Sequence, residues 1–202
     1  MKVIIAIPCL SVVPSEFMAS LARLTIAKAY DKKFSREVKL GLEFCQGSLV
    51  HTARNLLTSQ ALAVGATHIF FLDSDVICPA DTLDRLIAHH EPIVLASYMT
   101  RFKDNKGQHL IGEPLHETSP NGRLAAMRTA PLGCALIDLK VFQRLPKPWF
   151  AYLEGETPDN TISEDTYFCN AARQAGYTIW LDHMLTREVG HVTSSVILPR
   201  GL

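Results

Sequence analysis

Apolar and polar residues follow two different periods along the first hundred positions. Short apolar or alternating segments of strand length lie at residues 3–7, 37–44, 69–72 and 92–96. Apolar residues recur every three or four positions, as in helices, at residues 15–30, at 51–64 and from Pro79 to Ile87. Three strand–helix units in succession predict an α/β fold with right-handed connections, a mostly parallel central sheet and helices on both faces.

Prolines, glycines and serines indicate where these elements begin and end. Pro8 is expected to stop the first strand, and Ser11 or Ser15 to cap the following helix. Gly65 is expected to close the second helix, and Pro79 to occupy the first position of the third.

The second half of the chain has a different pattern. Residues 101–123 are rich in Gly, Pro, Asn, Lys and His and have no apolar period. The segments expected to be regular after this stretch are strands at 124–127, 132–139 and 178–181, and a helix from Ser163 to Ala175 closed by Gly176. We therefore expect an antiparallel half with long loops, ending in an irregular tail.

Composition and charge narrow the classes of partner. Lysine and arginine together number 20, as do aspartate and glutamate, so the net charge is zero and no basic surface for nucleic acid or an anionic membrane is indicated. The five cysteines form no C-x-x-C pair, which favours free thiols in a reducing compartment. No apolar run reaches membrane-spanning length. We expect a cytoplasmic protein whose specificity comes from a local site.

Two carboxylates directly follow the most apolar strand. Asp73 and Asp75 stand at its carboxyl end, which is where ligands of open α/β sheets bind. Because successive side chains of a strand alternate, we expect both carboxylates to point to one side and Ser74 to the other. Such a pair usually holds a cation or another compensating group, and a divalent cation there can neutralise the diphosphate of a nucleotide-linked substrate. The plainer alternative is a pair of residues that begins a loop.

Four further groups have both a chemical and a structural interpretation. Glu164 and Asp165 begin a predicted helix, where acidic residues favour the helix dipole, but a carboxylate there can also act as a general base. His191 is either an ordinary histidine or a ligand that, with a carboxylate, suits Mn²⁺ better than Ca²⁺. Arg54 is either solvated or binds a phosphate or nucleobase. Trp149 either packs in the core or stacks on a sugar or base.

In this order, these pieces resemble the GT-A glycosyltransferases, nearest to the family 2-like enzymes and their short phage and bacterial relatives. The run from Val3 to Pro8 is similar to the first strand of that family. Ala53-Arg54-Asn55 and the segment 65–75 are similar to the helix that leads into its D-x-D strand. The segment 133–137 resembles its glycine-containing acceptor-side segment.

Two motifs near the C-terminus extend the resemblance over most of the chain. Ser163-Glu164-Asp165 matches the x-E-D motif of the family, and His191 its metal-binding histidine. The resemblance implies one GT-A domain over residues 1–202, in which 1–100 bind the nucleotide sugar and 101–202 form the acceptor side and a metal-binding tail. It implies inverting, hexosyltransferase-type transfer from a nucleotide-sugar donor, with UDP expected, to an acceptor hydroxyl of unknown identity.

The same resemblance implies a role for each candidate residue. Asp75 and His191 would hold Mn²⁺ or Mg²⁺, Asp73 would contact the ribose or the metal shell, and Asp165 would deprotonate the acceptor. The residues implied on the donor side are Pro8, Arg54, Asp73 and Ser74, and those on the acceptor side are Gly133, Trp149 and Glu164. The chain has no C-terminal extension of the kind that often closes the acceptor site, so a homodimer is a possible source of the missing wall.

Three other functions compete with this interpretation. A haloacid-dehalogenase-like phosphatase also places Asp-x-Asp after an apolar strand, but normally on the first strand of its core, whereas a complete strand–helix–strand–helix unit precedes Asp73 here. A non-catalytic sugar-nucleotide-binding module would keep the fold but would have no reason to keep Asp75, Asp165 and His191 together. Adenylyl or cytidylyl transfer lacks the expected glycine-rich, basic loop after the first strand.

Overall fold

The computed structural model describes residues 1–100, 109–119, 122–155, 160–193 and 196–197. Along the chain the elements are β1 (Lys2–Cys9), α1 (Ser15–Tyr30), α2 (Lys32–Glu37), β2 (Lys39–Gln46), α3 (Val50–Ala63), β3 (His68–Leu72), β4 (Val76–Ile77), α4 (Thr82–Ala88), β5 (Ile93–Leu95), β6 (Glu113–Thr118), β7 (Leu124–Thr129), β8 (Cys134–Asp138), α5 (Leu139–Arg144), α6 (Glu164–Gln174), β9 (Ile179–Asp182), α7 (His183–Thr186), β10 (Gly190–Val192) and β11 (Val196–Ile197).

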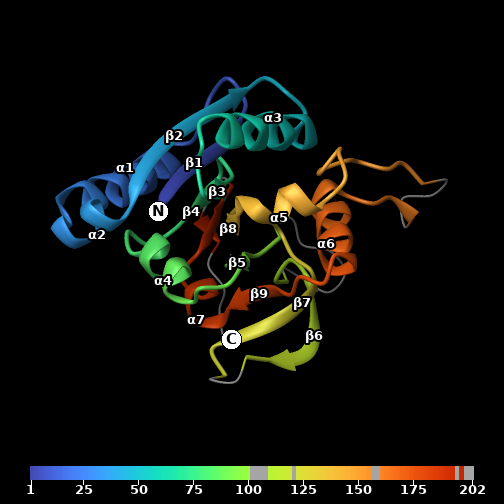
Figure 1. Ribbon diagram of the computed structural model, residues 1–202. Helices are drawn as coiled ribbons and strands as arrows, with labels where there is room; N and C mark the ends of the chain where they lie inside the picture. The colour runs from blue at the N-terminus through green and yellow to red at the C-terminus, as the bar shows by residue number, and fades with distance from the viewer. Residues whose placement is uncertain (101–108, 120–121, 156–159, 194–195, 198–202) are drawn as a thin grey trace.

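Eight strands form one central sheet in the order β2-β1-β3-β8-β5-β9-β7-β6 (Figure 1). The pairs β1–β2, β1–β3 and β5–β9 are parallel, whereas β8 is antiparallel to both β3 and β5, and β7 is antiparallel to both β9 and β6. Among the strands that the described residues contribute, only β7 and β8 therefore run against the others. A second, small sheet joins β4, β10 and β11.

Alternate residues of the strands build two hydrophobic layers, one on each face of the sheet. On one face Ile4, Ile69 and Ile137 pack with residues of α3, α5 and α6. On the other face Ile5 and Phe70 pack with residues of α1, α2, α4 and α7. Side chains of neighbouring strand positions point to opposite faces, so both faces are buried and the strands are apolar throughout.

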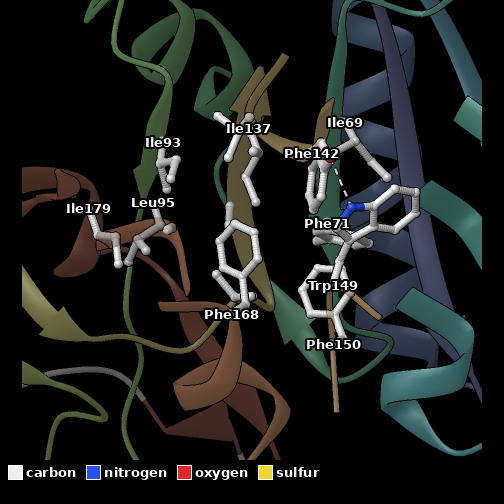
Figure 2. Packing of buried hydrophobic residues seen from close by; sticks show 14 of the residues in the cluster. Ile69, Phe71, Ile93, Leu95, Ile137, Phe142, Trp149, Phe150, Phe168 and Ile179 are labelled. Atoms are coloured by element: carbon white, nitrogen blue, oxygen red, sulfur yellow. Dashed lines mark hydrogen bonds between the residues drawn. The ribbon is translucent and has the colours of Figure 1, made fainter. Parts of the chain in front are cut away.

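An aromatic cluster fills the first of these layers (Figure 2). Phe150 stacks on Phe168 with 5.1 Å between ring centroids, and Phe71 meets Phe150 edge-on at 5.6 Å. Trp149 packs against Phe142, and its indole Nε1 donates a hydrogen bond to the Phe142 carbonyl (2.9 Å). The cluster fixes the base of α6 against the sheet, since Phe168 belongs to that helix.

The predicted architecture is confirmed: the protein is α/β, with a mostly parallel central sheet, helices on both faces and an antiparallel second half. Several predicted boundaries are also confirmed. Ser163 caps α6 by accepting a hydrogen bond from the Thr166 amide. Gly65 and Gly176 adopt the left-handed conformation directly after the ends of α3 and α6, with φ of 65° and 86°.

Three predicted boundaries are wrong. β1 continues through Pro8 to Cys9, because its pairing with β3 ends at Ala6 and only β2 flanks the proline. The residue before α1 is Pro14, not Ser11 or Ser15, and its side chain makes no capping bond. Pro79 lies in a turn ahead of α4, which begins at Thr82.

The second half contains more regular structure than its sequence indicates. β6 lies inside the stretch expected to be irregular, and its polar residues suit a strand that pairs on one side only. The expected tail contains α7 and β10, and β10 pairs with the two-residue strand β4. The turn signal at 120–121 lies outside the described residues. None of the helices built from described residues is both long and apolar enough to cross a membrane.

Candidate functional site

Five segments that are distant in sequence meet at the carboxyl ends of the parallel strands of the central sheet. Asp73 follows the carboxyl end of β3, and Tyr98 follows that of β5. α3 follows the carboxyl end of β2 and contributes Arg54, while Gly133 immediately precedes the antiparallel strand β8. α6 adds its N-terminal turn with Asp165. Since the carboxyl ends of parallel strands lie on the same side of the sheet, the topology gathers these polar side chains where an α/β sheet binds ligands.

The chain turns directly after β3, so the predicted strand alternation does not apply to Asp73 and Asp75. The Val76 amide donates to the Asp73 carbonyl (2.9 Å), which closes the turn with Ser74 in its middle. The two carboxylates consequently contact different partners. Asp73 faces Arg54 and Asp75 faces His191.

Arg54 is the centre of a buried cluster of charges. Its side chain is only 1% exposed, and its Nη2 donates to Asp73 Oδ2 (3.2 Å) while Nη1 lies 3.0 Å from Oδ1. The same guanidinium lies 3.5 Å from Asp165 Oδ1 and 3.9 Å from Glu164 Oε1. One cation thus serves three carboxylates. Burial opposes the charge of Arg54, but its acidic neighbours outweigh burial and hold the pKa of the guanidinium above its ordinary value.

Asp165 has the environment of a general base. Its side chain is 22% exposed and accepts a hydrogen bond from the Leu132 amide (3.3 Å). Burial raises the pKa of the carboxyl to about 7, although Arg54 opposes the rise. The negative charges of Glu164 and Asp73 add to it. Asp165 Oδ1 is buried and faces the Arg54 guanidinium, but makes no hydrogen bond among the described residues.

Tyr98 connects the charge cluster with His191. Its hydroxyl donates to Asp73 Oδ2 (3.4 Å), and its ring meets the His191 imidazole edge-on with 4.9 Å between centroids. Burial, aided by Asp73 and Asp165, holds the pKa of the phenol well above its ordinary value, so Tyr98 remains a donor. The absence of a side chain at Gly133 permits this packing, because a Cβ there would overlap both the Tyr98 hydroxyl and the Asp73 carboxylate.

The small sheet places His191 beside Asp75. β10 pairs with β4, and the Val192 amide donates to the Asp75 carbonyl (2.7 Å). His191 Nε2 then lies 3.6 Å from Asp75 Oδ2, and Nδ1 lies 2.9 Å from the Met99 carbonyl. Since a carbonyl only accepts, Nδ1 donates the hydrogen bond to Met99, and Nε2 is the ring nitrogen that faces the Asp75 carboxylate.

Asp75 and His191 are the two side chains of the site that could hold a divalent cation. An imidazole fixed by a backbone carbonyl and a carboxylate oxygen is a donor set that suits Mn²⁺. Across the described ranges, no group of three or more His, Cys, Asp or Glu side chains is placed to hold a metal ion. Asp73 is engaged by Arg54 rather than directed at the pair. Any cation held by this pair would need ligands beyond the His, Cys, Asp and Glu side chains of the described residues.

The other predicted site residues have mixed placements. Glu164 lies in the first turn of α6 beside Arg54, and Gly133 accepts a hydrogen bond from the Asp73 amide through its carbonyl (2.9 Å). Pro8 is buried near the end of β1. Trp149 is 4% exposed and packs within the aromatic cluster, which agrees with the first of its two interpretations, packing in the core.

Sequence reasoning missed several residues that shape the site. Nothing in the local pattern marks Tyr98 or the Met99 carbonyl, since both act through contacts distant in sequence. Asn55 lies next to Arg54 in the sequence, and its side chain donates to the Phe150 carbonyl (2.7 Å) and accepts from the Trp149 amide (3.1 Å). A polar residue amid the apolar positions of a helix was the available signal.

Comparison with known proteins identifies the fold. No protein-family model and no curated protein sequence matches the chain. Among solved structures, A197 from STIV matches with a TM-score of 0.60 at 13% identity, covering 100% of this chain and 96% of A197. TarS from S. aureus matches with a TM-score of 0.51 at 18% identity, covering 90% of this chain and 35% of TarS. Likeness at these identities concerns the fold alone, and the chain shares the mixed α/β fold of these two structures.

Proposed function

We propose that the protein is a metal-dependent glycosyltransferase that moves a sugar from a nucleotide-diphosphate donor to an acceptor hydroxyl with inversion. The observation that carries the proposal is the position of Asp165, a carboxylate whose pKa is raised to about 7. Asp165 lies at the same end of the parallel strands as Asp73 and the Asp75–His191 pair. A base of that pKa is matched to proton transfer near neutral pH.

Each residue has a distinct role in the proposed reaction. Asp165 accepts the proton of the acceptor hydroxyl. The hydroxyl oxygen attacks the anomeric carbon at the same time, from the face opposite the leaving diphosphate. Glu164 adds negative charge beside Asp165 and thereby helps to keep it basic. Arg54 holds Asp73 and Asp165 together, so its role is to position the carboxylates rather than to contact the donor base predicted from the sequence.

Asp75 and His191 would hold Mn²⁺ or Mg²⁺. When bound, the cation would offset negative charge that develops on the diphosphate leaving group. The protein prepares the pair by fixing the His191 ring through the Met99 carbonyl and by fixing the Asp75 backbone through the Val192 amide. Asp73 and Ser74, in the adjoining turn, remain the candidates for contact with the ribose.

We expect transfer to depend on pH through Asp165. Because the acting form is the carboxylate, kcat at saturating donor and metal should fall about tenfold per unit below pH 7 and level off above it. Initial rates between about pH 5.5 and pH 8.5 test this expectation. A flat profile over that range, measured with a step that is not limited by product release, would contradict the role of Asp165.

Metal-dependent donor binding is the most direct test of the proposal. Thermal unfolding would be followed with UDP-, GDP-, CDP- and TDP-sugars, each with and without Mn²⁺. One nucleotide class should raise Tm by about 5 °C or more, and only with metal, because a ligand at a hundredfold excess over Kd stabilises a protein by about 2.7 kcal/mol. Asp75→Ala should abolish this shift, whereas Glu16→Ala, which removes an exposed carboxylate on α1, should keep it.

The outcomes separate the competing functions. No metal-dependent shift with any nucleotide, or a shift that survives Asp75→Ala, would refute the metal assignment. Binding without turnover on a panel of acceptors would favour a sugar-nucleotide-binding module. Hydrolysis of phosphomonoesters would favour the phosphatase, although the glycosyltransferase fold argues against it. The UDP preference, the family 2 relationship, the two functional halves and the cytoplasmic location stay predictions.

A further inference from the structure

The β2 strand forms an open edge of the central sheet with an unusually apolar surface. β2 pairs with β1 over eight consecutive positions without a bulge, from Lys39 to Gln46, and no described strand pairs with its outer side. Leu42 and Phe44 lie on the face that carries α1 and α2 and are 43% and 45% exposed. A long, regular, apolar edge is a template for pairing with another chain.

The opposite edge of the same sheet is protected in the ways that natural edges usually are. β6 contains Pro114, which cannot donate a hydrogen bond to an added strand, and its register with β7 shifts on both sides of this proline. Its Glu113 forms an exposed ion pair with Arg128. β2 has neither a proline nor a bulge, so the two edges of this sheet differ in how they meet another chain (Figure 1).

We propose that β2 is the interface of a homodimer in which two copies pair antiparallel about Gly41. A two-fold axis through Gly41 places Lys39 of each copy opposite Glu43 of the other, and Leu40 opposite Leu42. Lys39 and Glu43 are both exposed, and neither forms an ion pair within the part of the chain that the structure describes. Opposite charges and apolar pairs facing each other stabilise antiparallel strands.

Self-pairing is favoured over another occupant by this charge pattern. A two-fold axis perpendicular to the sheet must pass through a residue, because facing side chains lie on the same side. An axis through Leu40 would face Lys39 with Gly41, and an axis through Leu42 would face Glu43 with Gly41. Only the register about Gly41 pairs both charges, and it pairs them twice. The apolar row then meets its own copy beside a pocket of about 370 Å³ lined by Phe34, Val38 and their neighbours.

Charge reversal tests the interface without touching the proposed active site. Sedimentation velocity over a range of concentrations should give wild type a mass of twice 22.4 kDa. Lys39→Glu and Glu43→Lys, made singly, each create two like-charged pairs and should raise the dimer Kd by about tenfold or more. The double variant K39E/E43K recreates both pairs and should restore dimerisation. Lys140→Glu, an exposed charge reversal on α5, serves as the matched control and should leave Kd unchanged.

Hydrogen exchange on the same samples reports on the strand itself. The β2 amides that point away from β1 should be protected in wild type and in the double variant, and should exchange faster in each single variant at the same concentration. A monomeric wild type would overturn the proposal, and protection in that monomer of β2 amides that point away from β1 would show another segment of the chain on the edge. A dimer unaffected by either single reversal would place the interface elsewhere and would equally overturn it. These results do not depend on glycosyl transfer.

Discussion

Replacing Asp165 by asparagine is expected to lower kcat for sugar transfer by about a thousandfold while leaving donor binding intact. A positioned general base contributes about 10²- to 10⁴-fold to such a rate, and the amide cannot accept the proton. Asparagine keeps the shape and an oxygen for the Leu132 amide, so the N-terminal turn of α6 should be preserved. The measurement is the transfer rate at saturating donor, together with the metal-dependent thermal shift of the variant.

The matched control is Asp138→Asn. Asp138 is also an aspartate at the start of a helix, where it accepts a hydrogen bond from the Lys140 amide. It lies far from the site, however, because it pairs with His68 at the amino end of β3. Asparagine caps helices as well as aspartate does, so this variant should retain both transfer and Tm. If Asp165→Asn kept more than about a tenth of wild-type kcat, a base other than Asp165 would have to be sought.

The sequence predicts the fold well wherever one period dominates a segment. The run from Ile69 to Leu72 is fully buried as a central strand, and the three- and four-residue spacing between Ala53 and Ala61 marks a face of α3. It fails where pairing rather than pattern creates a strand. β4 has two residues and forms only because β10 lies beside it, so no local signal near Val76 could reveal it.

For the candidate site, too, the sequence predicts which residues take part but not how they are arranged. Sequence motifs supplied Asp75, Asp165 and His191, and the structure brings Asp75 and His191 together. The turn after β3 decides that Asp73 points to Arg54, and turn geometry was not predicted. Tyr98 owes its role to a contact with Asp73 across the sheet. Such contacts depend on tertiary packing, which a single sequence does not reveal.

Arg54 is the residue whose loss should most disturb the molecule. Its guanidinium is the cation that serves Asp73, Glu164 and Asp165, and it also lies over the Phe71 ring, 5.2 Å from the centroid. A buried ion pair contributes little net stability, because both partners lose their hydration. Removing one partner is costly, however, because it leaves the other charge buried without compensation. Here the removal of one cation would leave three mutually repelling carboxylates without a positive partner.

We therefore expect Arg54→Met to lower the free energy of unfolding by about 3–5 kcal/mol at pH 8, and Tm by about 10 °C. The deficit should shrink as the pH falls. Arg54 lowers the pKa of the Asp165 carboxyl, so without Arg54 that pKa rises further and the group is neutral over a wider range. Calorimetry at pH 8 and pH 5 should show a smaller Tm difference from wild type at the lower pH.

Two variants separate the charge of Arg54 from the bulk of its side chain. Arg54→Lys keeps a cation but loses the planar fork that reaches Asp73 through two nitrogens, so it should fall between wild type and Arg54→Met in Tm. Arg23→Met removes an exposed arginine from α1 and should change stability by less than about 0.5 kcal/mol. A Tm deficit of Arg54→Met that is the same at both pH values would mean that lost packing, not stranded carboxylate charge, causes it. The cluster would then be a structural feature of α3 and α6 and not a device that tunes Asp165.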